Sequence, residues 1–256
     1  MEVRGKVVVV TGGGNGIGAA LARACAAAGA AGVVVGDLEA AAAAAVADGL
    51  GVPALALACD VGNEAGVQAL VAAARARFGR IDLYCSNAGF LGQTGGFEVD
   101  DGVWNGMWNV HVMAHVWAAR AVVPGMLEQG GGGFLITASA AGLLNIVESA
   151  PYAASKHAAV GFAEWLRIAH ARRGLTVTCL CPQFVRTRLI AGGAGATVPG
   201  EVITPEQVAT VALEALAADR FLALPHPEVA GYFQAKAQDP ERWLGAMGKL
   251  YERTPR

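Results

Sequence analysis

Seven short apolar runs alternate along the chain with longer, alanine-rich segments of helical character. The runs are continuously apolar, which predicts strands of a sheet that is covered on both faces. Because strand and helix repeat in turn, we expect the strands to pair in parallel, as a doubly wound α/β fold with seven strands. The strands are predicted at 7–10, 32–36, 54–58, 82–85, 134–137, 176–180 and 221–224, and the helices near 16–29, 39–48, 64–78, 104–128, 152–173 and 205–218.

Size and charge narrow the class of protein. The chain has 256 residues, 54% of them hydrophobic, and no Pro- or Ser-rich linker, so we expect one domain over residues 1–256. Its 19 basic and 21 acidic residues are intermixed and give a net charge of −2. Without a basic stripe, the sequence predicts neither a nucleic-acid partner nor a membrane-surface partner.

Location follows from the N-terminal residues and the cysteines. The apolar run before the first glycines is too short for a signal peptide. The five cysteines are an odd number, contain no C-x-x-C pair and mostly sit in apolar runs, where a thiol behaves as a small hydrophobe. We therefore expect a cytoplasmic protein, with no metal site.

The first predicted strand leads directly into a glycine-rich turn, Thr11-Gly-Gly-Gly-Asn-Gly-Ile-Gly18, before a helix. Such a turn lets backbone N–H groups approach a pyrophosphate at a helix N-terminus. The residues assigned to this contact are Gly12, Asn15, Gly16, Ile17 and Gly18.

Asp37 closes the second predicted strand about twenty residues further on. A carboxylate there accepts hydrogen bonds from ribose hydroxyls and repels a 2′-phosphate, so the sequence favours NAD over NADP. The turn also offers no Arg or Lys to an extra phosphate. The alternative is that Asp37 is the N-cap of the next helix.

Two further segments follow predicted strands and belong to the same nucleotide crevice. Asp60 and Val61 follow the third strand and are assigned to adenine, while Asn87, Ala88 and Gly89 follow the fourth and bring backbone close to the cofactor. Each is a common turn by itself. Their order and spacing along the chain make the combination specific.

Three residues suggest proton transfer: Ser139, Tyr152 and Lys156. If Tyr152 opens a helix, Lys156 lies on the same helix face one turn later. An ammonium lowers the pKa of a nearby phenol from about 10, and a serine hydroxyl can hold a carbonyl or alcohol oxygen. The alternative for the Tyr-x-x-x-Lys pair is a surface helix contact without chemistry.

Together, the glycine-rich turn, Asn87-Ala88-Gly89, Ser139 and Tyr152-x-x-x-Lys156 resemble the short-chain dehydrogenase/reductase family, in its single-domain form of about 250 residues with a Rossmann-type fold. The resemblance covers residues 7 to about 224. It implies metal-free hydride transfer between nicotinamide and a carbonyl or alcohol carbon. Tyr152 would be the acid or base, Ser139 would position the substrate oxygen, and Lys156 would hold the nicotinamide ribose and lower the pKa of Tyr152. Pro182, Val185 and Thr187 match the segment that contacts the nicotinamide carboxamide.

Two positions depart from the family pattern. Gln183 stands where relatives have glycine, so we assign it to the substrate pocket floor. His111 stands where relatives have the asparagine that holds a water next to the lysine, and it is a candidate to hold that water or to relay protons itself. The alternative register makes Asn109 that residue, because two residues rotate a helix by about 200°. His115 would share the face of His111, more plausibly as a packing residue.

The substrate side carries weaker signals. Residues 188–204 are rich in glycine and small apolar residues and are predicted to form a mobile lid, with a plain surface loop as the alternative. Leu143 and Leu144 are predicted to wall a pocket for an apolar ketone or secondary alcohol. Arg188 is the candidate for gripping a substrate carboxylate.

Residues 225–256 form a C-terminal extension rich in aromatic residues. We expect it to contact another subunit first and to form a pocket rim second. The helix after Tyr152 has small residues on part of its surface, and members of the family commonly assemble through this region, so a homotetramer or homodimer is expected.

We therefore predict an NAD-dependent alcohol dehydrogenase or carbonyl reductase. An NAD-binding sensor or scaffold without turnover is the alternative from another class, and an epimerase or dehydratase of the same family is the alternative among enzymes.

Overall fold

The computed structural model describes residues 1–188 and 201–254. Its sheet has the strand order β3-β2-β1-β4-β5-β6-β7, and all neighbouring strands pair in parallel. The doubly wound, seven-stranded parallel prediction is confirmed within those residues. The strands are β1 Val7–Thr11, β2 Gly32–Asp37, β3 Ala54–Ala58, β4 Leu83–Ser86, β5 Gly132–Thr137, β6 Leu175–Leu180 and β7 Leu222–Ala223.

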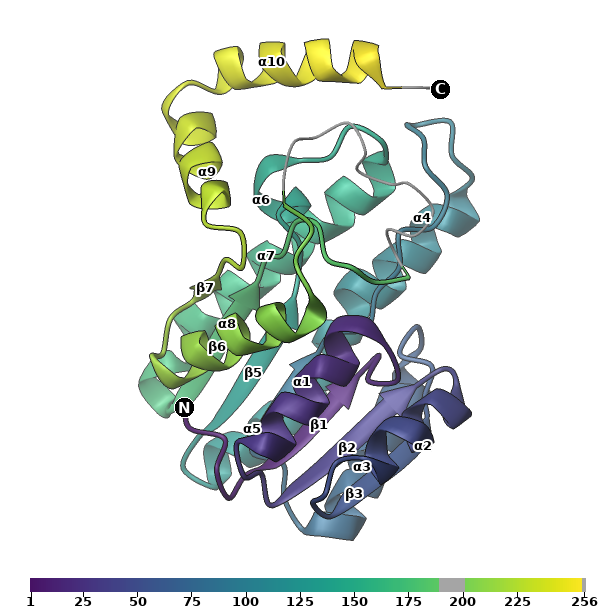
Figure 1. Cartoon of the computed structure of the whole chain (residues 1–256), viewed down its shortest axis with the longest axis vertical. Coiled ribbons are helices and arrows are strands. Elements are labelled where there is room, and N and C mark those ends of the chain that lie inside the picture. Colours follow the sequence, from purple (N-terminus) through teal and green to yellow (C-terminus); the bar gives the residue numbers. More distant parts are fainter. Residues whose placement is uncertain (189–200, 255–256) are drawn as a thin grey trace.

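Helices cover both faces of this sheet (Figure 1). A strand turns successive side chains to opposite faces, and β1 shows the result: Val8 and Val10 belong to one hydrophobic core and Val9 to the other. The first core lies under α1, α2 and α8, and the second under α3, α5 and α7. The helices are α1 Gly16–Ala27, α2 Ala40–Asp48, α3 Glu64–Phe78, α4 Asp101–Trp108, α5 Ala114–Glu128, α6 Ala141–Leu144, α7 Ala150–His170, α8 Pro205–Ala217, α9 Glu228–Gln238 and α10 Pro240–Arg253.

Helix α7 begins two residues earlier than the sequence predicts. The Ser149 side chain accepts a hydrogen bond from the Tyr152 backbone N–H at 3.4 Å and caps the helix, and Pro151 occupies its first turn. Tyr152 is therefore the third helical residue, and Lys156 follows one turn later. The capping serine thus fixes where the catalytic candidates sit on the helix.

The long helix between β4 and β5 runs without a break from Asp101 to Glu128, but it contains a π-helical segment at Asn109–Met113. By length and hydropathy this helix would suffice to cross a membrane, but half of its most apolar window is buried inside the fold. A core helix of a globular domain has the same properties, so this is weak evidence for a membrane span. π-Helical turns occur mostly at functional sites, and this one contains His111.

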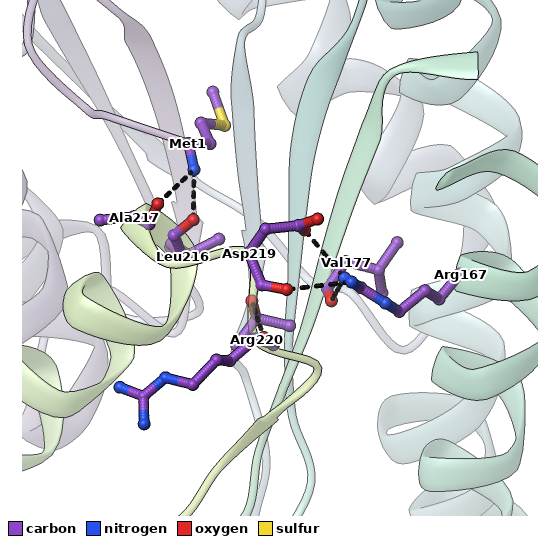
Figure 2. Close-up of polar contacts among 8 residues, drawn as sticks. Met1, Arg167, Val177, Leu216, Ala217, Asp219 and Arg220 are labelled. Carbon is purple, nitrogen blue, oxygen red and sulfur yellow. Dashed lines mark hydrogen bonds and ion pairs between the residues drawn. The ribbon is translucent and has the colours of Figure 1, made fainter. Parts of the chain in front are cut away.

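The turn that leads into the edge strand β7 is fixed by polar contacts (Figure 2). Asp219 has a φ of +50°, a left-handed conformation uncommon for a residue other than glycine. Arg167 of α7 donates to the Asp219 carboxylate and to the carbonyl of Val177, both from Nη1, at 2.9 and 3.1 Å. The amino group of Met1 contacts the Leu216 carbonyl at the end of α8. These contacts attach the end of α8 and the β7 edge to the rest of the sheet.

Helices α9 and α10 extend from the body as an arm beyond β7 (Figure 1). Val229 is buried on α9, whereas α10 has no fully buried residue. The arm passes over α6, a short helix that directly follows Ser139. The sequence indicated none of these three helices.

Candidate active site

A cavity of about 410 Å³ opens at the carboxyl ends of the strands, where the strand order reverses between β1 and β4. Ligands of doubly wound folds bind at such a switch point. Every residue that the sequence assigns to the cofactor lines this cavity. They are Gly12, Asn15, Gly16, Ile17, Gly18, Asp37, Asp60, Val61, Asn87, Ala88, Gly89, Tyr152, Lys156, Pro182, Val185 and Thr187.

Other lining residues carried no recognisable sequence signal, because they are common residues beside the motifs. They are Leu38, Cys59, Val110, Thr137 and Ala138.

The glycine-rich turn leaves no room for side chains. A Cβ at Gly12 would lie 2.9 Å from the Cα of Ala88, and one at Gly18 would lie 2.0 Å from the Gly12 carbonyl oxygen. Asn15 is the extended N-cap residue of α1, and its side chain makes no capping bond. The first amides of α1 are therefore available to an anion at the helix N-terminus.

Asp37 faces the glycine-rich turn. Its Oδ2 accepts a hydrogen bond from the Gly14 N–H at 2.8 Å, and its Oδ1 accepts one from the Glu39 N–H at 3.0 Å. The N-cap residue of α2 is Glu39. The alternative reading of Asp37 as that N-cap is therefore wrong, and its carboxylate stands at the edge of the cavity.

Asn87 joins the ends of three neighbouring strands. Its side-chain amide donates to the Thr11 carbonyl at 3.0 Å, and its Oδ1 accepts from the Thr137 hydroxyl at 3.0 Å. Asp60 is a loop-fixing residue instead, because its carboxylate accepts from the Gly62 N–H at 2.8 Å and from the Asn63 side chain at 2.9 Å. Both residues line the cavity.

Ser139, Tyr152 and Lys156 line the cavity together, and all three are buried. Ser139 follows β5, while Tyr152 and Lys156 lie one turn apart on α7. The Lys156 Nζ donates to the Thr137 carbonyl at 3.1 Å and lies 5.7 Å from the centre of the Tyr152 ring. The alternative reading of Tyr152 and Lys156 as an exposed surface pair is wrong.

Burial dominates the electrostatics of this trio. It raises the pKa of Tyr152, which the hydrogen bond from Ser139 partly offsets by lowering it. It also lowers the pKa of Lys156 to about 8. In the protein alone the pKa of Tyr152 is therefore raised and not lowered, because removal from water has the largest effect, and the lowering by Lys156 stays a prediction.

His111 is fully buried, and its ring centre lies 5.4 Å from that of Tyr152. The Phe90 N–H donates to its Nε2 at 3.2 Å, so that nitrogen carries no proton. Its Nδ1–H therefore donates to the Ser155 Oγ at 2.9 Å, and the Ser155 hydroxyl donates to the Tyr152 carbonyl at 3.0 Å. His111, and not Asn109, lies against the catalytic candidates.

This hydrogen-bond network gives His111 a different role from the one that the sequence predicts. Burial lowers its pKa well below the usual range, with the nearby Lys156 charge adding to the effect. Both ring nitrogens are bonded to protein groups, so the ring has no free nitrogen for a water or a relayed proton. The water-holding hypothesis is therefore wrong for its side chain, which instead ties Phe90 after Gly89 to helix α7.

His115 lies one turn after His111 and is also buried. Its Nδ1 shares a 2.6 Å hydrogen bond with the Ser86 hydroxyl, and its Nε2 has no hydrogen-bond partner within the described chain. Burial lowers its pKa to about 3. It is a neutral packing histidine, as the sequence suggested.

The substrate residues are only partly where they were expected. Gln183 lines the cavity, but Leu143 and Leu144 do not: both are buried in the core behind α6. An apolar residue after a strand can face a cavity or a core, and the sequence does not distinguish the two. The apolar neighbours of Tyr152 are instead Met107 and Ala141, flanked by Leu91, Val103 and Ile146.

Arg188 lies at the other end of the cavity from the one expected. Its Nη1 is 3.2 Å from the Glu39 carboxylate, two residues beyond Asp37. It therefore neighbours the side where the adenosine ribose is expected and is not placed to grip a substrate. Residues 189–200 of the predicted lid (188–204) fall outside the described residues. At its end, Ile203 pairs with Val185 as an isolated parallel bridge.

A family model described as short chain dehydrogenase matches residues 6–193, which is well over half of the chain. The chain belongs to the short-chain dehydrogenase family. A solved structure of a short-chain dehydrogenase/reductase from Burkholderia phymatum in complex with NAD superimposes with a TM-score of 0.85 at 32% identity, covering 94% of this chain and 96% of that one. A 3-ketoacyl-(acyl-carrier-protein) reductase from Brucella melitensis complexed with NADH gives a TM-score of 0.81 at 29% identity, covering 87% and 96%.

Curated relatives of this short-chain dehydrogenase match over shorter segments. A putative ketoacyl reductase from Streptomyces coelicolor is 38% identical over 55% of each chain. A 1-deoxy-11-beta-hydroxypentalenate dehydrogenase from Streptomyces exfoliatus is 38% identical over 67% of this chain and 64% of its own length. The matched part thus spans about half to two thirds of these curated relatives.

The C-terminal extension of this short-chain dehydrogenase lies beyond the family match, yet it contacts the catalytic region. Lys236 of α9 donates to the Leu143 carbonyl at 2.6 Å, and Trp243 of α10 donates to the Leu144 carbonyl at 3.4 Å. Lys236 also lies 3.4 Å from the Nε2 of His157, whose Nδ1–H donates to the Ala153 carbonyl at 2.8 Å. The extension therefore fixes both α6 and α7.

Proposed function

We propose that this short-chain dehydrogenase is an NAD-dependent oxidoreductase acting on the carbonyl or secondary alcohol carbon of an apolar substrate. The observation that carries the proposal is the joint burial of Ser139, Tyr152 and Lys156 in a cavity that also holds the glycine-rich turn. Bound NAD, held by that turn, by Asp37 and by Lys156, would supply or accept the hydride at its nicotinamide ring.

The residues divide the remaining chemistry between them. In reduction, the Tyr152 phenol donates its proton to the substrate oxygen as the carbon receives the hydride, and the Ser139 hydroxyl holds that oxygen. In oxidation, the phenolate takes the proton back. Because burial raises the pKa of Tyr152, the phenol keeps its proton near neutral pH and can act as the acid in reduction.

Asp37 supports NAD as the cofactor. Its carboxylate would accept hydrogen bonds from the ribose hydroxyls and repel a 2′-phosphate. Arg188, the nearest cation described at this end, is paired with Glu39. We therefore expect tighter binding of NADH than of NADPH.

An apolar substrate is supported by the surroundings of Tyr152. Met107 and Ala141 form a buried apolar cluster with Tyr152, and Leu91 and Ile146 pack against it, so the fold around the tyrosine is apolar. The names of the ketoacyl reductase relatives agree with a ketone substrate.

The test is turnover by the purified protein. NADH or NAD is mixed with a panel of apolar ketones and secondary alcohols, and the absorbance of the reduced nicotinamide is followed. Tyr152→Phe removes the transferable proton and keeps the ring, so we expect a rate loss of at least about a thousandfold with NADH affinity unchanged. Full turnover by Tyr152→Phe would refute the mechanism. NADH binding without turnover of any panel member would favour the sensor alternative.

We also propose that the protein is cytoplasmic and assembles as a homotetramer or homodimer through the outer face of α7. Trp165 and Ile168 lie one helical turn apart on that face and are 57% and 82% exposed, so they offer apolar surface to a second subunit. Light scattering after gel filtration tests the assembly. Trp165→Glu together with Ile168→Glu should give a monomer.

A further inference from the structure

His226 is a buried histidine at the start of the C-terminal extension. It follows β7 between Pro225 and Pro227, and only 1% of its surface is exposed. The family match ends at residue 193, so His226 belongs to no motif that the sequence offered. Its side chain nevertheless reaches back to the cavity wall.

The chemistry of its partners fixes its protonation. The Gln183 N–H donates to Nδ1 at 3.1 Å, and a backbone N–H can act only as a donor, so Nδ1 is unprotonated. The proton therefore sits on Nε2, which donates to the carbonyls of Phe184 at 3.2 Å and Glu201 at 3.1 Å. All the hydrogen-bonding capacity of the ring is used.

These partners belong to the wall that the sequence assigns to the nicotinamide. Gln183 and Phe184 follow Pro182, and Pro182, Gln183, Val185 and Thr187 all line the cavity. The Pro182 carbonyl is itself held by the Ala140 N–H at 2.8 Å. Beyond that point, the wall is held by the His226 ring together with the Ile203 N–H, which donates to the Phe184 carbonyl at 3.1 Å.

The same ring also ties the chain where it returns toward α8. Glu201 is one partner of Nε2, and the backbone of Arg186 donates to the Ile203 carbonyl at 2.9 Å. The ring thus bonds the outgoing segment at residues 183 and 184 and the returning segment at residue 201.

We infer that His226 is a positioning residue that holds the wall from Pro182 to Thr187 ready for the nicotinamide end of the cofactor. The inference rests on the proposed function, because it presupposes that the cofactor occupies this cavity. Without the anchor, the wall spends part of its time in other conformations. The apparent dissociation constant then rises by the inverse of the competent fraction, while chemistry in the assembled complex is unchanged.

Two conservative variants separate the two halves of the ring. In His226→Asn the side-chain oxygen replaces Nδ1 and can still accept from the Gln183 N–H. In His226→Gln the terminal amide replaces Nε2 and can still donate to the carbonyls of Phe184 and Glu201, but the Gln183 bond is lost. His226→Ala removes both. Val229→Ala is the matched control, because it opens a cavity on the same extension without touching the wall.

The experiment measures the dissociation constant for NADH by fluorescence titration and kcat at saturating NADH, with thermal stability recorded for each protein. We expect NADH binding to weaken about tenfold in His226→Ala and His226→Gln, and less than about threefold in His226→Asn and Val229→Ala. The kcat at saturation should stay within about threefold of wild type in all four.

The outcomes are distinguishable. If wild type binds NADH but His226→Ala and His226→Gln bind it equally well, the inference is refuted and the proposed function stands. If Val229→Ala weakens binding as much as His226→Ala at a similar loss of stability, the effect is general and the inference is also refuted. If wild type binds neither NADH nor NADPH, the proposed function and the inference fail together.

Discussion

Lys156 is a buried lysine, and burial penalises its charged form. Burial lowers the pKa of Lys156 from the ordinary 10.5 to about 8 in the folded protein. The folded state therefore holds fewer protons than the unfolded state between pH 8 and 10.5, and stability rises with pH across that window. Below pH 8 the full penalty of the buried ammonium is present.

Replacing Lys156 by Met should therefore stabilise the protein while it removes activity. The gain expected at pH 7 is about 2 kcal/mol, because the lost bond to the Thr137 carbonyl offsets part of the burial penalty. Chemical denaturation without cofactor measures it, with the exposed Lys249→Met as control. The gain should shrink as the pH rises from 8 to 10.5. A Lys156→Met protein that is less stable than wild type at pH 7 would contradict the assigned burial penalty.

His111 and His115 give a dependence of the same sign, on the acid side. Their folded pKa values lie below the ordinary 6.5, that of His115 at about 3, so the unfolded state takes up their protons first as the pH falls. Stability should fall ever more steeply from pH 6.5, with the slope reaching about 2.7 kcal/mol per pH unit near pH 5, where unfolding takes up nearly two protons.

His115→Phe should remove one of those two protons. The slope of stability against pH should then halve, to about 1.4 kcal/mol per unit, whatever happens to the baseline when Ser86 loses its partner. Denaturant titrations at pH 6.5, 6.0, 5.5 and 5.0 measure the slope. Equal slopes in variant and wild type would mean that His115 is not a neutral buried group.

At the scale of elements, the contacts of the C-terminal arm with α6 suggest a role in shaping the substrate side. Burial lowers the pKa of Lys236, whose ammonium binds the last turn of α6, where the helix dipole favours a cation. Lys236 also reaches His157, next to Lys156 on α7. The arm therefore steadies the segment that follows Ser139.

Lys236→Met should raise the KM for the carbonyl substrate several-fold and lower stability by about 1 kcal/mol, because α6 loses its cationic partner. The NADH dissociation constant should not change, since the arm's contact with the cofactor wall runs through His226 instead. Steady-state kinetics and NADH titration measure both quantities, with Lys249→Met as control. A parallel change in NADH affinity would show that the two contacts of the arm are not separable.

Some of these elements could be predicted from the sequence, and others could not. The strands were predictable because their apolar runs are continuous, and the cofactor residues were predictable because the glycine-rich turn and Asp37 have a fixed spacing. The π-helical segment around His111 and the four-residue α6 have no such pattern. The ion pair between Arg188 and Glu39 could not be predicted from the sequence either, because the two residues lie 149 positions apart along the chain.

At the scale of the whole molecule, the cofactor cavity joins the two halves of the sheet. The glycine-rich turn follows β1, and Asp37 is the last residue of β2. Ser139 follows β5, and Pro182 follows β6. A ligand that touches both halves binds the folded state alone, so it should stabilise the whole domain by mass action. This links cofactor preference to a measurement that needs no substrate.

NADH at a hundred times its dissociation constant should stabilise the fold by about 2.7 kcal/mol and raise the Tm by roughly 5 to 10 °C. NADPH at the same concentration should give a smaller shift, because its 2′-phosphate meets the Asp37 carboxylate. Asp37→Ser removes that repulsion and the bond to the Gly14 N–H, so the NADH shift should fall and the difference between the cofactors should narrow. Scanning calorimetry of both proteins with each cofactor measures the four shifts. An equal or larger NADPH shift in wild type would mean that Asp37 does not select the cofactor and that Arg188 leaves Glu39 to meet the phosphate.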